Sequence, residues 1–131
     1  MDAFFGSWKL VKRENYNVIL AVCGTEEEVI QLADVVKPVI TFSQDGDSLV
    51  YTVDHVILKT RTKFRFGEEF YEEVFPGRFC RSTMKLEGEK LIHVRLYQGF
   101  EFTTVREIQD GILIATITHE DITAVQTYEK V

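Results

Sequence analysis

The stretch NYNVILAVCGTEEEVIQLADVVKP, residues 15–38, decides the interpretation of this chain, because it is the segment with a helical pattern. Asn15 is a good N-cap for a helix over Tyr16–Cys23, since its side-chain oxygen can accept a bond from a free backbone N–H. Gly24 follows, and glycine favours the left-handed backbone that ends many helices. These residues predict a first short helix.

A second helix is predicted from the run Thr25–Glu28. Threonine with glutamate three positions later is a capping box, and three acidic residues suit the positive end of a helix dipole. Apolar residues then recur at helical spacing, and Pro38 ends the segment. The two helices, about residues 15–37, therefore form a helix-turn-helix.

On both sides of this segment the pattern is that of short strands. Runs rich in Val, Ile, Thr, Phe and Tyr are separated by turn signals at intervals of roughly 8–12 residues. The turn signals are Asp45-Gly46-Asp47, Gly67, Pro76-Gly77, Glu87-Gly88, Gln98-Gly99 and Asp110-Gly111. The ten predicted strands are Phe5–Arg13, Pro38–Gln44, Leu49–His55, Leu58–Phe66, Glu69–Phe75, Arg78–Leu86, Lys90–Tyr97, Phe100–Ile108, Ile112–His119 and Thr123–Lys130. Such spacing is typical of an antiparallel sandwich or barrel.

The number of strands also sets the space inside. A barrel of about eight strands encloses side chains or one small ligand, so ten strands should leave more room. The helical pair is inserted between the first two strands and is too small to be a second domain. We expect residues 1–131 to form one domain in which the helices cover one end of a barrel.

The composition limits the class of protein. The chain has 131 residues, 45% of them hydrophobic and 27% charged, which is typical of a globular protein and excludes disordered and fibrous classes. Its net charge of −6 argues against nucleic-acid binding. The sequence shows no secretory signal, no apolar run of about 18 residues and no lipidation motif. We expect a cytoplasmic monomer that touches membranes at most transiently.

The reactive residue types form no recognisable active site. Cys23 and Cys80 lack metal-binding spacing, and a cytosolic setting favours free thiols. Neither they nor the three histidines lie in a nucleophile elbow, a zinc motif or a phosphate-binding loop. We expect no enzyme activity, no metal and no cofactor. A β module with a solid interior that acts in protein interactions stays an alternative.

A set of short motifs runs along the whole chain. They are Gly6-Ser7-Trp8-Lys9-Leu10, Asn15-Tyr16, Lys37-Pro38, Phe66-Gly67-Glu68-Glu69-Phe70, Thr104-Val105-Arg106-Glu107 and Thr127-Tyr128-Glu129-Lys130-Val131. As a set they resemble the intracellular lipid-binding protein family, which includes the fatty-acid-binding proteins and the cellular retinoid-binding proteins. The resemblance implies an all-β fold, a ten-stranded antiparallel up-and-down β-barrel with a helix-turn-helix lid. It also implies a carrier that binds a long-chain fatty acid or another apolar molecule in an internal cavity.

The resemblance further implies a headgroup site. In the family a ligand carboxylate typically meets an Arg-x-Tyr motif near the C-terminus and a second arginine one hairpin earlier. Arg106 matches that second arginine and Tyr128 matches the tyrosine, but Gln126 stands where the motif has arginine. Glutamine can hold a hydroxyl or an amide as well as a carboxylate, so retinol or another neutral ligand stays an alternative. Arg95 would replace the lost positive charge if it points inward.

The tail of such a ligand is expected to contact residues at positions that commonly line the cavity in the family. These are Tyr16, Leu20, Pro38, Val53, Ile57, Phe75, Arg78, Phe102, Thr104, Ala115 and Ile117. The apolar members of this set are equally consistent with ordinary core, since a lipid tail packs against core-like walls. Alternation does not decide whether Arg106 points inward, because both faces of its strand are mixed.

The predicted helical pair is acidic. Glu26, Glu27, Glu28 and Asp34 dominate it, and Lys37 opposes them. A negative surface is repelled by an anionic membrane leaflet. We therefore expect the ligand to be delivered by release into water and not by collision with a membrane.

Overall fold

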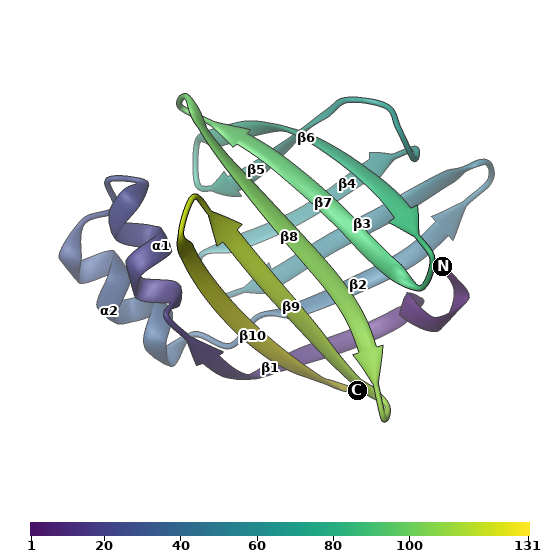
Figure 1. The fold of residues 1–131 in the computed structure, drawn as a ribbon, viewed down its shortest axis with the longest axis horizontal. Coiled ribbons are helices and arrows are strands. Elements are labelled where there is room, and N and C mark those ends of the chain that lie inside the picture. The colour runs from purple at the N-terminus through teal and green to yellow at the C-terminus, as the bar shows by residue number, and fades with distance from the viewer.

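Ten antiparallel strands curve into a barrel, and two helices cover one of its ends (Figure 1). This computed structural model describes the backbone of residues 1–131 and all side chains except those of Asp34 and Val35. The predicted fold class, a ten-stranded antiparallel barrel with a helical pair between its first two strands, is confirmed.

The elements follow one another along the chain with short turns between them. Before the barrel comes a 3-10 helix, η1 (Asp2–Phe4), and the helices of the lid are α1 (Tyr16–Val22) and α2 (Glu27–Val35). The strands are β1 (Gly6–Glu14), β2 (Val39–Asp45), β3 (Ser48–His55), β4 (Leu58–Phe64), β5 (Phe70–Phe75), β6 (Arg78–Glu87), β7 (Lys90–Tyr97), β8 (Phe100–Gln109), β9 (Ile112–His119) and β10 (Ile122–Lys130).

The strand order makes this an up-and-down barrel. Across the sheet it is β4-β3-β2-β1-β10-β9-β8-β7-β6-β5, so most strands pair with their neighbours along the chain and the first strand also pairs with the last. β4 and β5 are the two edges of the sheet and are not hydrogen-bonded to each other. The barrel is therefore nearly closed, with one seam between β4 and β5.

Alternation along the strands decides what lines the interior, since successive side chains of a strand point to opposite faces. On β8 the buried residues are Phe102, Thr104 and Arg106, and the residues between them are only half-buried. β10 does the same with Gln126 and Tyr128. The face of β8 that the sequence left open is thus settled by the pairing of β8 with β7 and β9, which turns Arg106 inward.

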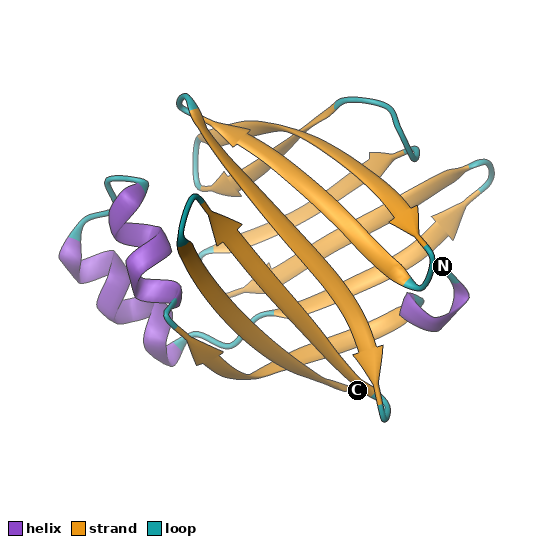
Figure 2. Cartoon of the chain, viewed as in Figure 1, coloured by secondary structure: helices purple, strands orange, loops and turns teal.

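The lid lies at one end of the barrel, and η1 lies at the opposite end (Figure 2). Ile19 of α1 is buried and packs with Tyr97, Phe102 and Ile117 from the barrel, which fastens the lid to the strands. Among the described residues, no helix combines the length and the apolar character that crossing a bilayer requires.

The sequence predicted the end of α1 correctly but not the cap at its beginning. Gly24 takes the left-handed backbone with φ 75°, as expected for a residue just past a helix. Its N–H bonds to the carbonyl of Ala21, and the N–H of Thr25 bonds back to the carbonyl of Leu20. Thr25 therefore serves the end of α1, and the predicted capping box is wrong: Glu26 is the N-cap residue of α2 and makes no side-chain cap bond.

The start of α1 shows a second departure from expectation. Asn15 is the N-cap residue, but it lies in the left-handed region with φ 65° and its side chain makes no cap bond. Its amide instead donates to the carbonyl of Thr123 on β10, at 3.2 Å. The bond across the barrel rim replaces the local cap and fixes where the chain leaves β1.

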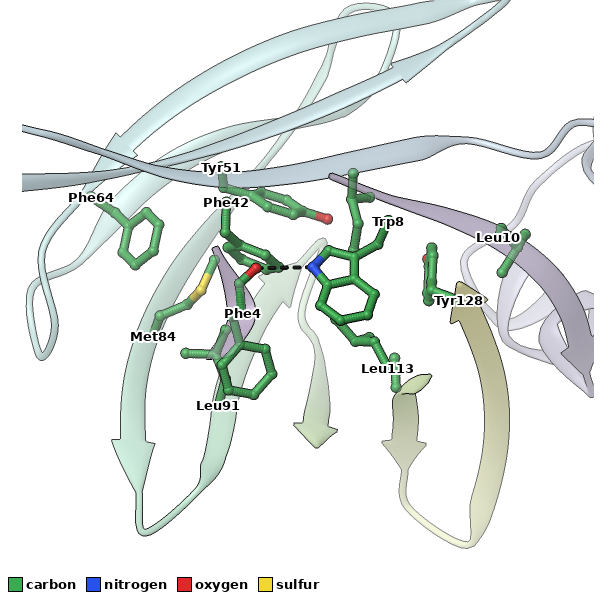
Figure 3. Close-up of a cluster of buried hydrophobic side chains, with 12 residues drawn as sticks. Phe4, Trp8, Leu10, Phe42, Tyr51, Phe64, Met84, Leu91, Leu113 and Tyr128 are labelled. Carbon is green, nitrogen blue, oxygen red and sulfur yellow. Dashed lines mark hydrogen bonds between the residues drawn. The ribbon is translucent and has the colours of Figure 1, made fainter. Parts of the chain in front are cut away.

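Side chains fill the end of the barrel away from the lid. Phe4, Trp8, Phe42, Met84 and Leu113 belong to one buried cluster (Figure 3). The Trp8 indole N–H donates to the Phe4 carbonyl at 2.9 Å, which holds η1 against the barrel. The packed cluster therefore occupies the barrel on the side away from the lid.

The buried cluster generates a prediction for stability. Leu113 on β9 is fully buried opposite Ile108 and Tyr128, so Leu113→Ala should lower the free energy of unfolding by about 2–5 kcal/mol because it leaves a cavity. Ile114→Ala, on the other face of β9 and half-buried, should cost less. Urea unfolding followed by Trp8 fluorescence measures both, and since we propose one domain we expect a single transition. Equal losses would contradict the assignment of the faces.

Candidate functional site

An internal cavity of about 360 Å³ lies between the packed core and the lid. On the lid side it is lined by residues of both helices, among them Tyr16 and Leu20 of α1 and Val29 of α2. On the barrel side it is lined by inward residues of several strands. The alternative of a solid interior is therefore wrong.

Almost all the residues predicted for the site lie on this cavity. They are Tyr16, Leu20, Pro38, Val53, Ile57, Phe75, Arg78, Arg95, Phe102, Thr104, Arg106, Ile117, Gln126 and Tyr128. Ala115 is the exception: it is 1% exposed and belongs to the packed core cluster. The contact of these residues with a ligand stays a prediction.

Arg106 is a buried cation with polar but uncharged neighbours. Its Nη1 donates to His93 Nδ1 at 3.0 Å, and its Nη2 donates to the Tyr51 hydroxyl at 3.3 Å. The guanidinium also lies over the rings of Phe42 and Tyr51, 5.6 and 5.3 Å from their centroids. Its Nε makes no hydrogen bond, and no carboxylate among the described side chains pairs with it. Arg106 therefore carries a positive charge without a counter-ion.

Glu72 of β5 is a buried carboxylate that the sequence analysis missed. Its Oε2 accepts hydrogen bonds from Ser82 Oγ and His93 Nε2, both at 2.6 Å. Its Oε1 accepts from Arg95 Nε at 3.3 Å and Nη2 at 3.2 Å. Burial alone would raise the pKa of the Glu72 carboxyl, but the charge of Arg95 and the bonds from His93 and Ser82 outweigh burial and hold that pKa far below its usual range. Glu72 is therefore ionised.

His93 stands between Glu72 and Arg106 and is neutral. Its Nδ1 accepts from Arg106, so the proton of the ring sits on Nε2 and points to Glu72. Burial, reinforced by the charge of Arg95, lowers the pKa of His93 to about 3. Glu72, Ser82, His93, Arg95 and Arg106 thus form one connected group, called the buried polar cluster below.

Arg95 points inward, and Glu72 balances its charge. The bond is made by two N–H groups of one guanidinium to one carboxylate oxygen, between β7 and β5. The idea that Arg95 supplies the positive charge missing at Gln126 therefore needs revision. The surplus charge of the buried polar cluster lies on Arg106.

Gln126 and Tyr128 form a second polar pair on the wall. The Tyr128 hydroxyl donates to Gln126 Oε1 at 3.1 Å, which leaves the amide N–H groups of Gln126 available as donors. Burial raises the pKa of Tyr128, so this hydroxyl stays protonated at neutral pH. The pair adds hydrogen-bonding capacity without adding charge.

Arg13 of β1 joins the lid to the barrel. It pairs with Gln126 across the β1–β10 ladder, and its guanidinium lies 4.6 Å from the Tyr16 ring centroid. Its Nη1 donates to the backbone carbonyls of Ala33 and Val36. Arg13 was not predicted for the site, although the ladder register places it next to a predicted residue.

Ser82, Glu72 and His93 combine the side chains of a catalytic triad in an arrangement unsuited to nucleophilic attack. The Ser82 hydroxyl donates to Glu72, so His93 is not positioned to take its proton. Both ring nitrogens of His93 are engaged. Burial raises the pKa of both cysteine thiols, which keeps them protonated. Among the described residues, no group of three or more side chains could hold a metal ion.

Glu72 left a signal in the sequence that the analysis did not use. The inward positions of β5 run through Phe70, Glu72 and Val74, so a glutamate lies between two apolar residues on one face. A buried acid requires donors nearby. Its partners come from β6 and β7, and only the register of the sheet shows which residues they are.

Comparison with known proteins gives matches over nearly the whole chain. A family model described as the lipocalin / cytosolic fatty-acid binding protein family matches residues 5–131. The bilirubin-inducible fluorescent protein UnaG of Anguilla japonica is 36% identical over 137 residues, which cover 99% of this chain and 97% of UnaG.

Solved structures agree closely with the fold. A Schistosoma mansoni fatty acid binding protein in complex with arachidonic acid superposes with a TM-score of 0.92 at 29% identity, covering 100% of this chain and 98% of that one. Fatty-acid-binding protein 1 of Echinococcus granulosus gives a TM-score of 0.92 at 26% identity, covering 100% and 99%. The resemblance inferred from the motifs is therefore confirmed at the level of family and fold.

The neutral state of His93 predicts a loss of stability in mild acid. An unfolded histidine takes up a proton near pH 6.5, whereas folded His93 does so only at about pH 3. Between these values the unfolded state binds one more proton, so the free energy of unfolding falls as pH falls, by about 1.4 kcal/mol per pH unit. His93→Gln should flatten this slope, because glutamine can keep both hydrogen bonds without titrating.

Urea unfolding at pH 7, 6 and 5 measures both slopes. This range lies above 4.5, the ordinary pKa of a glutamate, so Glu72 adds little to it. Below that value Glu72 should add a loss of the same sign. Identical slopes in the two proteins would show that His93 does not resist protonation.

Proposed function

Because this chain belongs to the lipocalin / cytosolic fatty-acid binding protein family, we propose that it is a cytoplasmic carrier of a long-chain fatty acid held inside the barrel. The carboxylate lies at Arg106, with Gln126 and Tyr128 as further polar contacts, and the tail fills the cavity toward the lid. The observation that carries this proposal is the surplus charge of Arg106 on the wall of an internal cavity.

Electrostatics favours an anionic head at this place. A buried charge without a counter-ion is costly, and so is a carboxylate taken out of water. Bringing the two together relieves both costs, and a guanidinium offers donors in the planar fork that fits a carboxylate. The free Nε of Arg106 leaves capacity for such a contact.

The remaining walls suit an apolar tail. The cavity volume falls within the range of about 300–1,000 Å³ found for small-molecule sites. Val53, Phe102 and Ile117 offer apolar surface on the barrel side, and Leu20 offers it on the lid. Among the described residues, three buried side-chain polar atoms have no hydrogen-bond partner, and all three belong to residues on this wall: Arg13 Nε, Thr104 Oγ1 and Arg106 Nε.

We propose that the protein is a monomer without enzyme activity, and the chemistry of the buried polar cluster fits this role. The residues of the cluster are hydrogen-bonded to one another, and Ser82 has no base beside it that could activate its hydroxyl. A ligand held there would be bound and released unchanged.

A second candidate is a larger or neutral apolar ligand. Gln126 is uncharged and can bond a hydroxyl or an amide, which suits a retinol-like molecule. The relative UnaG is named for its response to bilirubin, so a larger pigment of that kind, which carries carboxylates of its own, is a further ligand to compare. A fluorescence titration with bilirubin and one with retinol compare these ligands with palmitic acid.

Replacing Arg106 tests the fatty-acid proposal. Arg106→Gln should weaken palmitate binding by roughly 10- to 100-fold, because a hydrogen bond to a charged group contributes about 1.5–3 kcal/mol. Binding of hexadecanol, which has the same tail and no charge, should change much less. Displacement of a fluorescent fatty acid measures both affinities.

Arg81→Gln is the matched control, since Arg81 lies on the outer surface and pairs with Glu69 there. It should leave both affinities unchanged. Wild-type protein that binds hexadecanol and palmitate equally well would favour the neutral-ligand candidate. Near-ultraviolet circular dichroism verifies that each variant is folded.

The charge of the lid generates a prediction for ligand delivery. Glu27 and Glu28 are exposed in the first turn of α2, beside exposed Glu26, whereas the side chain of Asp34 lies outside the described residues. Transfer of an anthroylated fatty acid to anionic vesicles should therefore proceed at a rate independent of vesicle concentration, because the lid is repelled by the leaflet. Stopped-flow fluorescence measures this rate, and a rate that rises with vesicle concentration would indicate collision.

A further inference from the structure

The buried polar cluster contains an internal carboxylate that competes with any anionic ligand for cations. Glu72 is 5% exposed, and both of its oxygens are occupied by donors from β6 and β7. Its two strongest partners by charge and distance are Arg95 and His93, and only Arg95 is charged. Glu72 therefore acts first on Arg95.

Two guanidinium groups reach the cluster, and they differ in their surroundings. Arg95 has a carboxylate partner, whereas Arg106 meets only neutral acceptors, His93 and the Tyr51 hydroxyl. The single carboxylate of Glu72 balances one of the two arginines, so one positive charge is left over. The hydrogen bonds place this charge on Arg106. His93 separates the two halves: it accepts from Arg106 on one side and donates to Glu72 on the other.

We propose that Glu72 determines specificity by acting as a built-in counter-ion of Arg95, so that the buried polar cluster accepts a ligand head with one negative charge and places it at Arg106. This inference rests on the proposed function and names the class of ligand within it. The preferred ligands are apolar monocarboxylates. A head with two acid groups side by side exceeds the free charge, because its second group would have to displace Glu72 from Arg95.

Other charged groups on the cavity wall leave this charge count intact. Arg78 is exposed and donates to the Tyr97 hydroxyl at 3.3 Å. Arg13 donates to the backbone carbonyls of Ala33 in α2 and of Val36 just after it. Glu73 accepts from the N–H of Gly77 in the turn that follows β5. None of the three contacts Glu72.

The pairing of Glu72 with Arg95 predicts that changing both residues together restores binding. Purely structural roles for these two residues would not predict this. Arg95→Gln removes the partner of Glu72, leaving Arg106 as the cation that must balance it, so palmitate affinity should fall roughly tenfold or more. Glu72→Gln added to Arg95→Gln removes both charges and leaves Arg106 free again. The double variant should therefore recover most of the wild-type affinity for palmitate.

Glu72→Gln alone tests the class of ligand. It frees the charge of Arg95, so the affinity for hexadecylmalonic acid, which has two carboxylates on one carbon, should rise roughly tenfold or more relative to palmitate. Glu107→Gln is the matched control, since it removes a glutamate from the outer face of β8, where Glu107 pairs with Lys90, and it should leave this ratio unchanged. Isothermal titration calorimetry at pH 7.4 with both acids and hexadecanol gives all the affinities.

The outcomes separate the two proposals. If wild-type protein does not prefer palmitate to hexadecanol, the proposed function fails. If it does, but Arg95→Gln binds palmitate as well as wild type or the double variant does not recover, Glu72 is not the counter-ion and the inference alone is overturned. The double variant carries no unbalanced buried charge from this pair, so the test holds even where Glu72→Gln does not fold.

Discussion

The constraint on which this protein depends is the cost of keeping ionised groups away from water. Arg95, Arg106 and Glu72 place their charged groups inside the barrel. An unpaired charge there costs roughly several kcal/mol, even after the surrounding protein has relaxed. Glu72 meets this cost with four donated hydrogen bonds. Arg106 meets it with two bonds and two aromatic faces, which stabilise a cation but leave its charge unbalanced. Among the described side chains no carboxylate balances the charge of Arg106, and Arg106 lines the cavity.

The barrel makes such an interior possible because it satisfies its own backbone. Each strand is hydrogen-bonded to its neighbours except at the seam between β4 and β5, so the inner wall offers side chains and few free backbone groups. Packing at one end and helices at the other divide the interior into a solid and a hollow part. Arg106 lies at the boundary of this division. Phe42, whose ring it covers, belongs to the packed cluster, whereas Tyr51 and Thr104 line the hollow part.

Sequence patterns predicted the strands well and the contacts between them poorly, for a physical reason. Turn residues and alternation are local, so all ten strands and Gly24 at the end of α1 were found. Asn15 and Thr25 failed as caps because partners elsewhere in the chain claimed the groups involved. The inward positions of Arg95 and Glu72 follow from alternation once register is known, but their bond joins β5 to β7 across β6 and leaves no trace in spacing.

The neutral side chain of Gln126 changes which residues supply positive charge to the cavity. With no charge there, selectivity for a carboxylate rests on the balance among Arg95, Glu72 and Arg106, and not on the number of arginines facing the cavity. The Gln126 amide N–H groups then offer donors that can serve a carboxylate, a hydroxyl or a pigment carbonyl alike, since the Tyr128 hydroxyl donates to Gln126 Oε1. In the proposed function, the charge difference between ligands is sensed at Arg106, while shape and apolar area are sensed by the walls. Because the two are carried by different residues, ligand polarity and ligand size can change independently within this fold.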